Sequence, residues 1–77
     1  MSKEITWSLE IIRNKVTEIL QQALSTFFLP TVKIKKVYLE NGNLVVEGDY
    51  SYFDEKGKYK VILRNDTLYL VRYELLL

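Results

Sequence analysis

The stretch VYLENGNLVV, residues 37–46, predicts the β-hairpin around which the rest of the chain is arranged. Its centre, Asn41-Gly42, separates two runs that are rich in β-branched and aromatic residues. An Asn-Gly pair in that setting is the strongest short hairpin signal, because both turn residues take a positive φ. We therefore predict antiparallel strands over residues 32–40 and 44–53.

Two further strands follow the hairpin. Residues 58–64 and 67–75 again favour strand, and they are separated by turn-forming residues at Asp54-Glu55-Lys56-Gly57 and at Asn65-Asp66. Such short connections make consecutive strands antiparallel neighbours. The sequence therefore predicts a four-stranded antiparallel β-meander.

The part of the chain before the hairpin predicts one helix over residues 4–28. Apolar residues recur there at steps of three and four, which places them on one face of a helix. These residues are Ile5, Leu9, Ile12, Val16, Ile19, Ala23 and Phe27. Ser2 is the expected N-cap, Glu4 suits the first turn, and Pro30 ends the helix. The predicted fold is a single α+β domain, residues 1–77, with one long N-terminal helix packed on the meander.

The predicted sheet is apolar on more than the one face that a helix can cover. Leu44, Val46 and Tyr50 alternate on one side of their strand, whereas residues 67–75 carry apolar residues on both sides. A change of phase at Lys35-Lys36 predicts a bulge there, and Gly48 marks a bulge or a close approach of the helix. We expect the uncovered face near the last strand to meet a partner, with these interface residues: Tyr69, Val71, Arg72, Tyr73 and Leu75.

Composition argues against catalysis. The 77 residues include neither His nor Cys, so the common acid, base, nucleophile and zinc-ligand side chains are missing. Asp49, Asp54 and Glu55 form the densest acidic group, which turn chemistry explains. We expect no enzyme, no catalytic or metal site, no cofactor and no small-molecule substrate.

The expected location is the cytoplasm. No stretch approaches 18 uninterrupted apolar residues, and Met1-Ser2-Lys3-Glu4 lacks the layout of a signal peptide. The composition also fits a thermophilic source. The apolar end, Leu75-Leu76-Leu77, is expected to dock on the protein's own helix or on another subunit rather than on a membrane.

Nucleic-acid binding is the alternative function. Lys33 and Lys35 alternate along one predicted strand, and Lys58 and Lys60 along another, with tyrosines between them. That pattern is typical of a sheet that neutralises phosphates and stacks bases. Against it, the net charge is only +1, and lysines on an edge strand also prevent aggregation.

The last two strands resemble the gas vesicle protein O family. Tyr59, Val61 and Leu63 match its Tyr-x-Val-x-Leu run, and Leu68, Arg72 and Tyr73 match its final strand. The family's Arg-Ile-Pro segment is missing. The resemblance implies a helix followed by strands and a non-enzymatic assembly or regulatory role. The order of elements is also similar to cystatin-type inhibitors, without their Gln-x-Val-x-Gly loop, and a designed protein is a further alternative.

Together these observations predict a small non-enzymatic interaction module. Its expected partner is a second copy of itself or another protein, because a chain of 77 residues buries little surface alone and gains stability from association.

Overall fold

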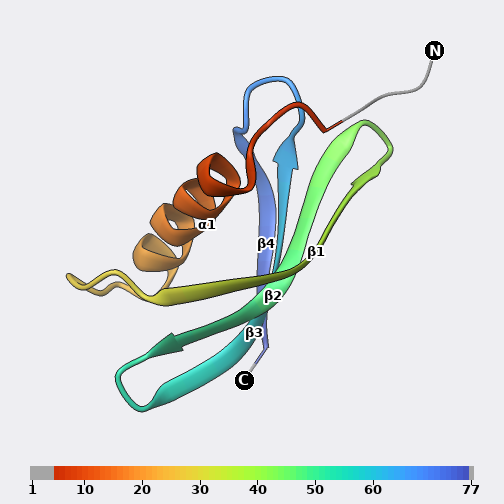
Figure 1. The fold of residues 1–77 in the computed structure, drawn as a ribbon. Helices are drawn as coiled ribbons and strands as arrows, with labels where there is room; N and C mark the ends of the chain where they lie inside the picture. Colours follow the sequence, from red (N-terminus) through yellow and green to blue (C-terminus); the bar gives the residue numbers. More distant parts are fainter. Residues whose placement is uncertain (1–4, 77) are drawn as a thin grey trace.

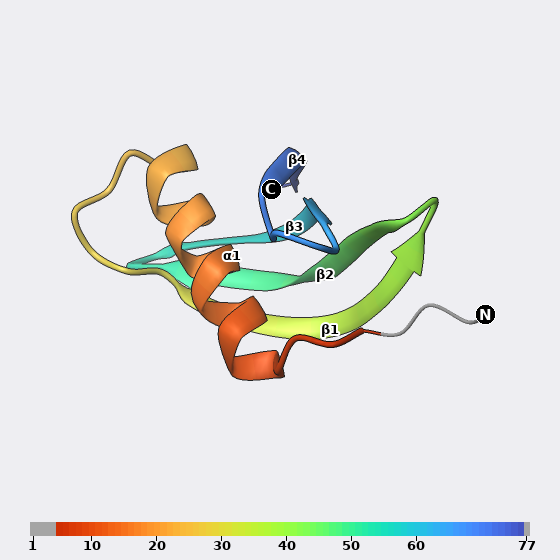
Figure 2. The same ribbon diagram turned by 90° about the horizontal axis from the view of Figure 1, so that it is seen from above.

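The computed structural model describes residues 5–76 and confirms the α+β meander. Helix α1 spans Leu9–Ala23 and is followed by strands β1 (Thr31–Glu40), β2 (Asn43–Tyr52), β3 (Glu55–Arg64) and β4 (Leu70–Leu76). The four strands form one antiparallel sheet in the order β1-β2-β3-β4 (Figure 1). The sheet is strongly twisted, and α1 lies across one of its faces, while β1 and β4 form its two edges (Figure 2).

The helix is shorter than the sequence predicts. Ser8 caps its start, because the Ser8 hydroxyl accepts a hydrogen bond of 3.2 Å from the Ile11 amide. It ends at Ala23, and Ser25 then takes a left-handed φ of 53°. The predicted bounds 4–28 are therefore wrong at both ends, since backbone caps rather than the apolar period decide them. Ser2 and Glu4 lie outside the described residues.

The first turn is confirmed, because Asn41 and Gly42 take φ values of 53° and 82°. The second turn is not the predicted one. It consists of Phe53 and Asp54, with Phe53 at φ 53°, and Tyr52 pairs with Glu55. Residues 55–57, predicted as turn, therefore belong to β3, and the predicted start at residue 58 is wrong.

The last connection is longer than predicted. Residues 65–69 form it, and β4 begins at Leu70 rather than at residue 67. The Arg64 amide donates a hydrogen bond of 2.8 Å to the Tyr69 carbonyl, which closes the loop. Leu68 takes φ 63° inside the loop and is buried in the core. Leu68, which the sequence predicts to lie in the last strand, is thus a loop residue whose side chain is held in the core.

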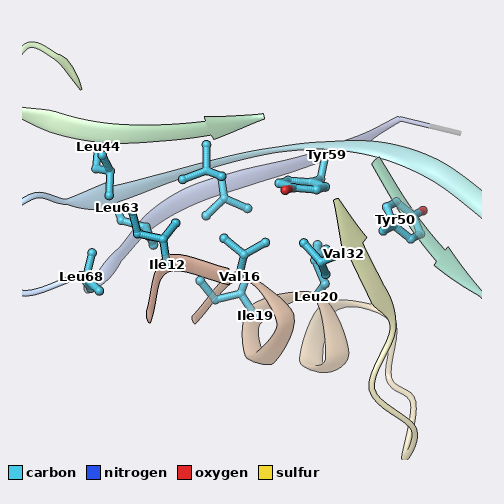
Figure 3. Close-up of a cluster of buried hydrophobic side chains, with 12 residues drawn as sticks. Ile12, Val16, Ile19, Leu20, Val32, Leu44, Tyr50, Tyr59, Leu63 and Leu68 are labelled. Atoms are coloured by element: carbon cyan, nitrogen blue, oxygen red, sulfur yellow. The ribbon is translucent and has the colours of Figure 1, made fainter. Parts of the chain in front are cut away.

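The core lies between α1 and the face of the sheet that α1 covers, which we call the helix face. Four helix residues point into it: Ile12, Val16, Ile19 and Leu20. They meet strand residues that alternate along the sheet: Val32, Leu44, Val46, Tyr50, Tyr59, Val61 and Leu63 (Figure 3). Trp7 fastens the segment before α1 by donating a hydrogen bond of 2.7 Å to the Asn65 carbonyl. Leu9 and Phe27, which the periodicity placed on the core stripe, are exposed instead.

The predicted bulge lies in β1 and is stabilised from β3. The β1–β2 register shifts between Ile34 and Lys36, beside Gly48. Tyr59 sits opposite Gly48 and donates a hydrogen bond of 2.9 Å to the Lys33 carbonyl. A Cβ on Gly48 would lie 1.8 Å from the Lys33 carbonyl oxygen, so only glycine fits there. The close approach at Gly48 is thus made by β1 and the Tyr59 phenol.

Candidate functional site

Strand β4 is an edge strand whose side chains are mostly exposed on both faces of the sheet. Tyr69 just before it is 67% exposed, Val71 is 49% exposed and Tyr73 is 43% exposed, which is high for large apolar side chains. The outer edge of β4 carries the unpaired backbone groups that an edge strand presents. This combination of a free edge and apolar side chains is what a protein-binding strand offers.

The five predicted interface residues do not all lie in equivalent places. Tyr69 lies in the loop before β4, and Val71 lies at a register shift between β3 and β4. Tyr73 faces Val61 on the helix face, whereas Arg72 faces Ile62 on the opposite side of the sheet. Leu75 is partly buried against the core. Of the five predicted interface residues, Tyr69, Val71, Arg72 and Tyr73 are therefore exposed, and Leu75 anchors the strand.

The other edge of the sheet is protected. β1 carries Lys33, Lys35 and Lys36 and contains the bulge. Charged side chains and bulges are the usual means by which proteins prevent an edge strand from pairing with another chain. The two edges of this sheet therefore differ, and only β4 is suited to accept another strand.

The face of the sheet away from α1, which we call the open face, is rich in basic side chains. Directly opposed residues share a face, so the register assigns each paired charged residue to one side. Lys35 lies at the bulge, and its ion pair with Asp49 places it on the open face. All the Lys and Arg residues after Pro30 lie on the open face: Lys33, Lys35, Lys36, Lys56, Lys58, Lys60, Arg64 and Arg72. The acidic residues there are Glu40, Glu47, Asp49 and Glu74. Because Asp54, Glu55 and Asp66 lie on turns or on the helix face, the open face is basic although the whole chain is nearly neutral.

Some of these charges already have partners. The Lys35 ammonium lies 2.9 Å from the Asp49 carboxylate, and the Arg64 guanidinium lies 3.3 Å from the carboxylate of Asp66. Arg64 hydrogen-bonds Asp66 and holds the pKa of that carboxyl below its usual value. These are the two ion pairs within residues 5–76, so Lys33, Lys56 and Lys58 have no acidic partner within 4.0 Å in that part of the chain.

Glu47, on the same face, is hydrogen-bonded to Tyr38. The Tyr38 hydroxyl donates a hydrogen bond of 2.5 Å to the Glu47 carboxylate. That hydrogen bond raises the pKa of Tyr38 to about 12. Val45 lies opposite Tyr38 and is only 1% exposed, so the middle of the open face is partly apolar.

A hollow of about 740 Å³ lies at the end of the sheet where β2 turns into β3. We call it the basic hollow. Its lining comes from every strand of the sheet: Thr31, Lys33, Asp49, Tyr50, Ser51, Lys56, Gly57, Lys58 and Leu76. Lys33 and Lys58 were predicted from the sequence as nucleic-acid residues, and they line this hollow. Lys35 and Lys60 lie on the open face outside it.

A second exposed apolar patch lies where the loop between α1 and β1 meets the turn between β2 and β3. The rings of Phe28 and Phe53 contact edge to face, with centroids 5.5 Å apart. Phe27 and Leu29 are exposed beside them. The patch is not apparent from the sequence because Phe27 and Phe28 there read as part of the helix.

Within residues 5–76 no group of three His, Cys, Asp or Glu side chains is arranged to hold a metal ion. No helix in the same part of the chain is long and apolar enough to cross a membrane.

Compared with models of protein families, with curated proteins and with solved structures, the chain shows no significant match. The resemblance to the gas vesicle protein O family therefore stays a prediction.

Proposed function

We propose that this protein is a non-enzymatic interaction module that works as a homodimer, in which β4 pairs antiparallel with β4 of a second copy. The observation that carries the proposal is the free β4 edge with its exposed apolar side chains, set against a β1 edge that lysines and a bulge protect. Such a dimer would join two four-stranded sheets into one continuous sheet. A self-assembling module is consistent with the assembly role that the sequence resemblance implies.

The sequence of β4 favours one register for this pairing. In an antiparallel pair related by a two-fold axis, opposed residues lie on the same face, so the axis passes through a residue position. With the axis at Tyr73, Arg72 of each copy would face Glu74 of the other. Opposite charges that face each other across two strands stabilise the pair by about 0.2–1 kcal/mol.

The neighbouring registers are disfavoured by like charges. An axis at Arg72 would place the two Arg72 side chains opposite each other, and an axis at Glu74 would do the same with Glu74. With the axis at Tyr73, Val71 would face Leu75 of the other copy. The strand is thus self-complementary in charge and apolar in its remaining positions.

The test uses light scattering at micromolar concentration on the wild type and on two charge-reversal variants. We expect a dimer for the wild type and monomers for Arg72→Glu and for Glu74→Arg, because each variant creates two like-charge contacts. An equimolar mixture of the two variants should restore a dimer. In that mixed pair, one chain would carry glutamate at both positions and would face a chain that carries arginine at both.

Lys36→Glu is the matched control, because it reverses a charge on the open face at the β1 edge and should leave the dimer intact. Glu74 also faces Lys60 within the chain, so circular dichroism has to show that Glu74→Arg is folded. A monomeric wild type would rule out the homodimer. A dimer that survives both single reversals would rule out the proposed register.

A further inference from the structure

We infer that the basic hollow binds a phosphate group, carried either by a nucleotide or by the backbone of a nucleic-acid strand. The inference goes beyond the proposed dimer and does not depend on it, because the lysines concerned lie on β1 and β3. It rests on the charge, the shape and the apolar wall of the hollow.

The charge of the hollow is positive and unpaired. Three lysines line it, namely Lys33, Lys56 and Lys58, and among residues 5–76 Asp49 is the one acidic residue in its lining. Asp49 is already engaged by Lys35 at 2.9 Å. In the described part of the chain, no further carboxylate lines the hollow to neutralise the three ammonium groups. A concave surface concentrates their field on a bound anion.

The hydroxyls of Thr31 and Ser51 complete the polar lining. These two residues face each other across β1 and β2, and Lys56 faces Ser51 from β3. Three adjacent strands thus place two neutral donors and one ammonium group in a single row. A phosphate group has several oxygen acceptors, and ammonium and hydroxyl groups are its usual partners on protein surfaces.

The hollow is larger than a phosphate and has an apolar part. Its volume of about 740 Å³ falls within the usual range for small-molecule sites. Leu76, which is 62% exposed and lies opposite Lys58, contributes apolar surface beside the lysines. A sugar or a base attached to the phosphate would therefore find an apolar wall, which favours a nucleotide or a nucleic-acid strand over inorganic phosphate.

The test titrates the ¹⁵N-labelled full chain with two classes of probe and monitors binding by the amide chemical shifts. Pyrophosphate and ATP represent free phosphate compounds, and a short oligothymidylate represents a nucleic-acid strand. In either case we expect the amides of Lys33, Ser51 and Lys58 to shift. For the oligonucleotide, affinity should fall as salt rises, because phosphate contacts release counterions.

Lys58→Gln should weaken binding about tenfold, because it removes a charge-assisted contact to the phosphate. Lys36→Gln is the matched control, with the same change of charge on the same face but outside the hollow. Binding of ATP that depends on Lys58 would identify a nucleotide site, and binding of the oligonucleotide alone would identify a nucleic-acid site. Absence of binding to every probe at low salt, or an equal loss with Lys36→Gln and Lys58→Gln, would overturn the inference.

Discussion

The pairing of Tyr59 with Gly48 shows how one residue position fixes the shape of the sheet. Gly48 leaves space for β1 to approach β2, and the Tyr59 ring covers the backbone that a missing side chain would expose. The Tyr59 hydroxyl then satisfies the Lys33 carbonyl at the bulge. Burial raises the pKa of Tyr59 to about 12, since ionisation would place a charge inside the core.

Tyr59→Phe should lower the free energy of unfolding by about 1 kcal/mol at neutral pH, because it leaves the Lys33 carbonyl without its donor. The wild type should also lose stability between pH 10 and about 12, where Tyr59 ionises in the unfolded chain but stays neutral in the folded one. Urea unfolding measured from pH 8 to pH 12 should therefore show the difference between wild type and variant shrinking above pH 10. A constant difference across that range would contradict the assigned burial of Tyr59.

The sequence predicts the Asn41-Gly42 turn well and the cross-strand partner of Gly48 poorly. The Asn41-Gly42 turn depends only on the conformations of two adjacent residues, so local rules are sufficient. The partner of Gly48 depends on the register between β2 and β3. The predicted turn at residues 54–57 would have paired Phe53 with Lys58 and placed Gly48 opposite Leu63, whereas the observed turn places it opposite Tyr59.

At the scale of the element, α1 shows that apolar periodicity defines the middle of a helix better than its ends. The period continues through Leu9 and Phe27, but both side chains are exposed. The helix begins at the Ser8 cap and ends before the left-handed Ser25. Serine is common in loops and helices alike, so its presence alone does not locate a helix end.

Ser8→Ala should lower the free energy of unfolding by about 1 kcal/mol, because the Ile11 amide loses its capping acceptor. Ser8→Asp is the matched control and should keep the wild-type stability, since a carboxylate caps as well as a hydroxyl and favours the positive end of the helix dipole. Thermal unfolding followed by circular dichroism measures both. Equal losses in the two variants would show that Ser8 does not act as a cap.

The two candidate sites also differ in how far the sequence reveals them. The exposure of β4 follows from a local pattern, because apolar residues on both sides of one strand exceed what a single helix can cover. The sequence reveals the basic hollow only in part, through the alternating lysines that include Lys33 and Lys58. Thr31, Ser51 and Lys56 are scattered along the chain, and only the register of three strands brings them into one row.

At the scale of the whole molecule, the proposed dimer would add stability to a domain whose core is small. The chain has one layer of side chains between α1 and the helix face (Figure 3). Several of its large apolar residues stay exposed. A dimer formed through β4 would therefore be more stable than the single chain, and its unfolding would be coupled to dissociation.

The melting temperature of the wild type should accordingly rise with protein concentration. A tenfold increase contributes about 1.4 kcal/mol per dimer, or half of that per chain, which corresponds to roughly 3–6 °C for a domain of this size. Arg72→Glu should melt at one temperature at every concentration. Differential scanning calorimetry over two decades of concentration tests both expectations, and a wild-type melting temperature that does not change would contradict the dimer.

The protected β1 edge has a consequence for how far such an assembly extends. A sheet with two receptive edges is a template for fibril growth, because each added copy leaves a fresh edge for the next. Here each copy would use its single receptive edge, and the outermost strands of the dimer would both be β1, with its lysines and bulge. The bulge and lysines of β1 would then stop growth of the sheet at the dimer. A variant without them would have a second receptive edge and would form open-ended aggregates.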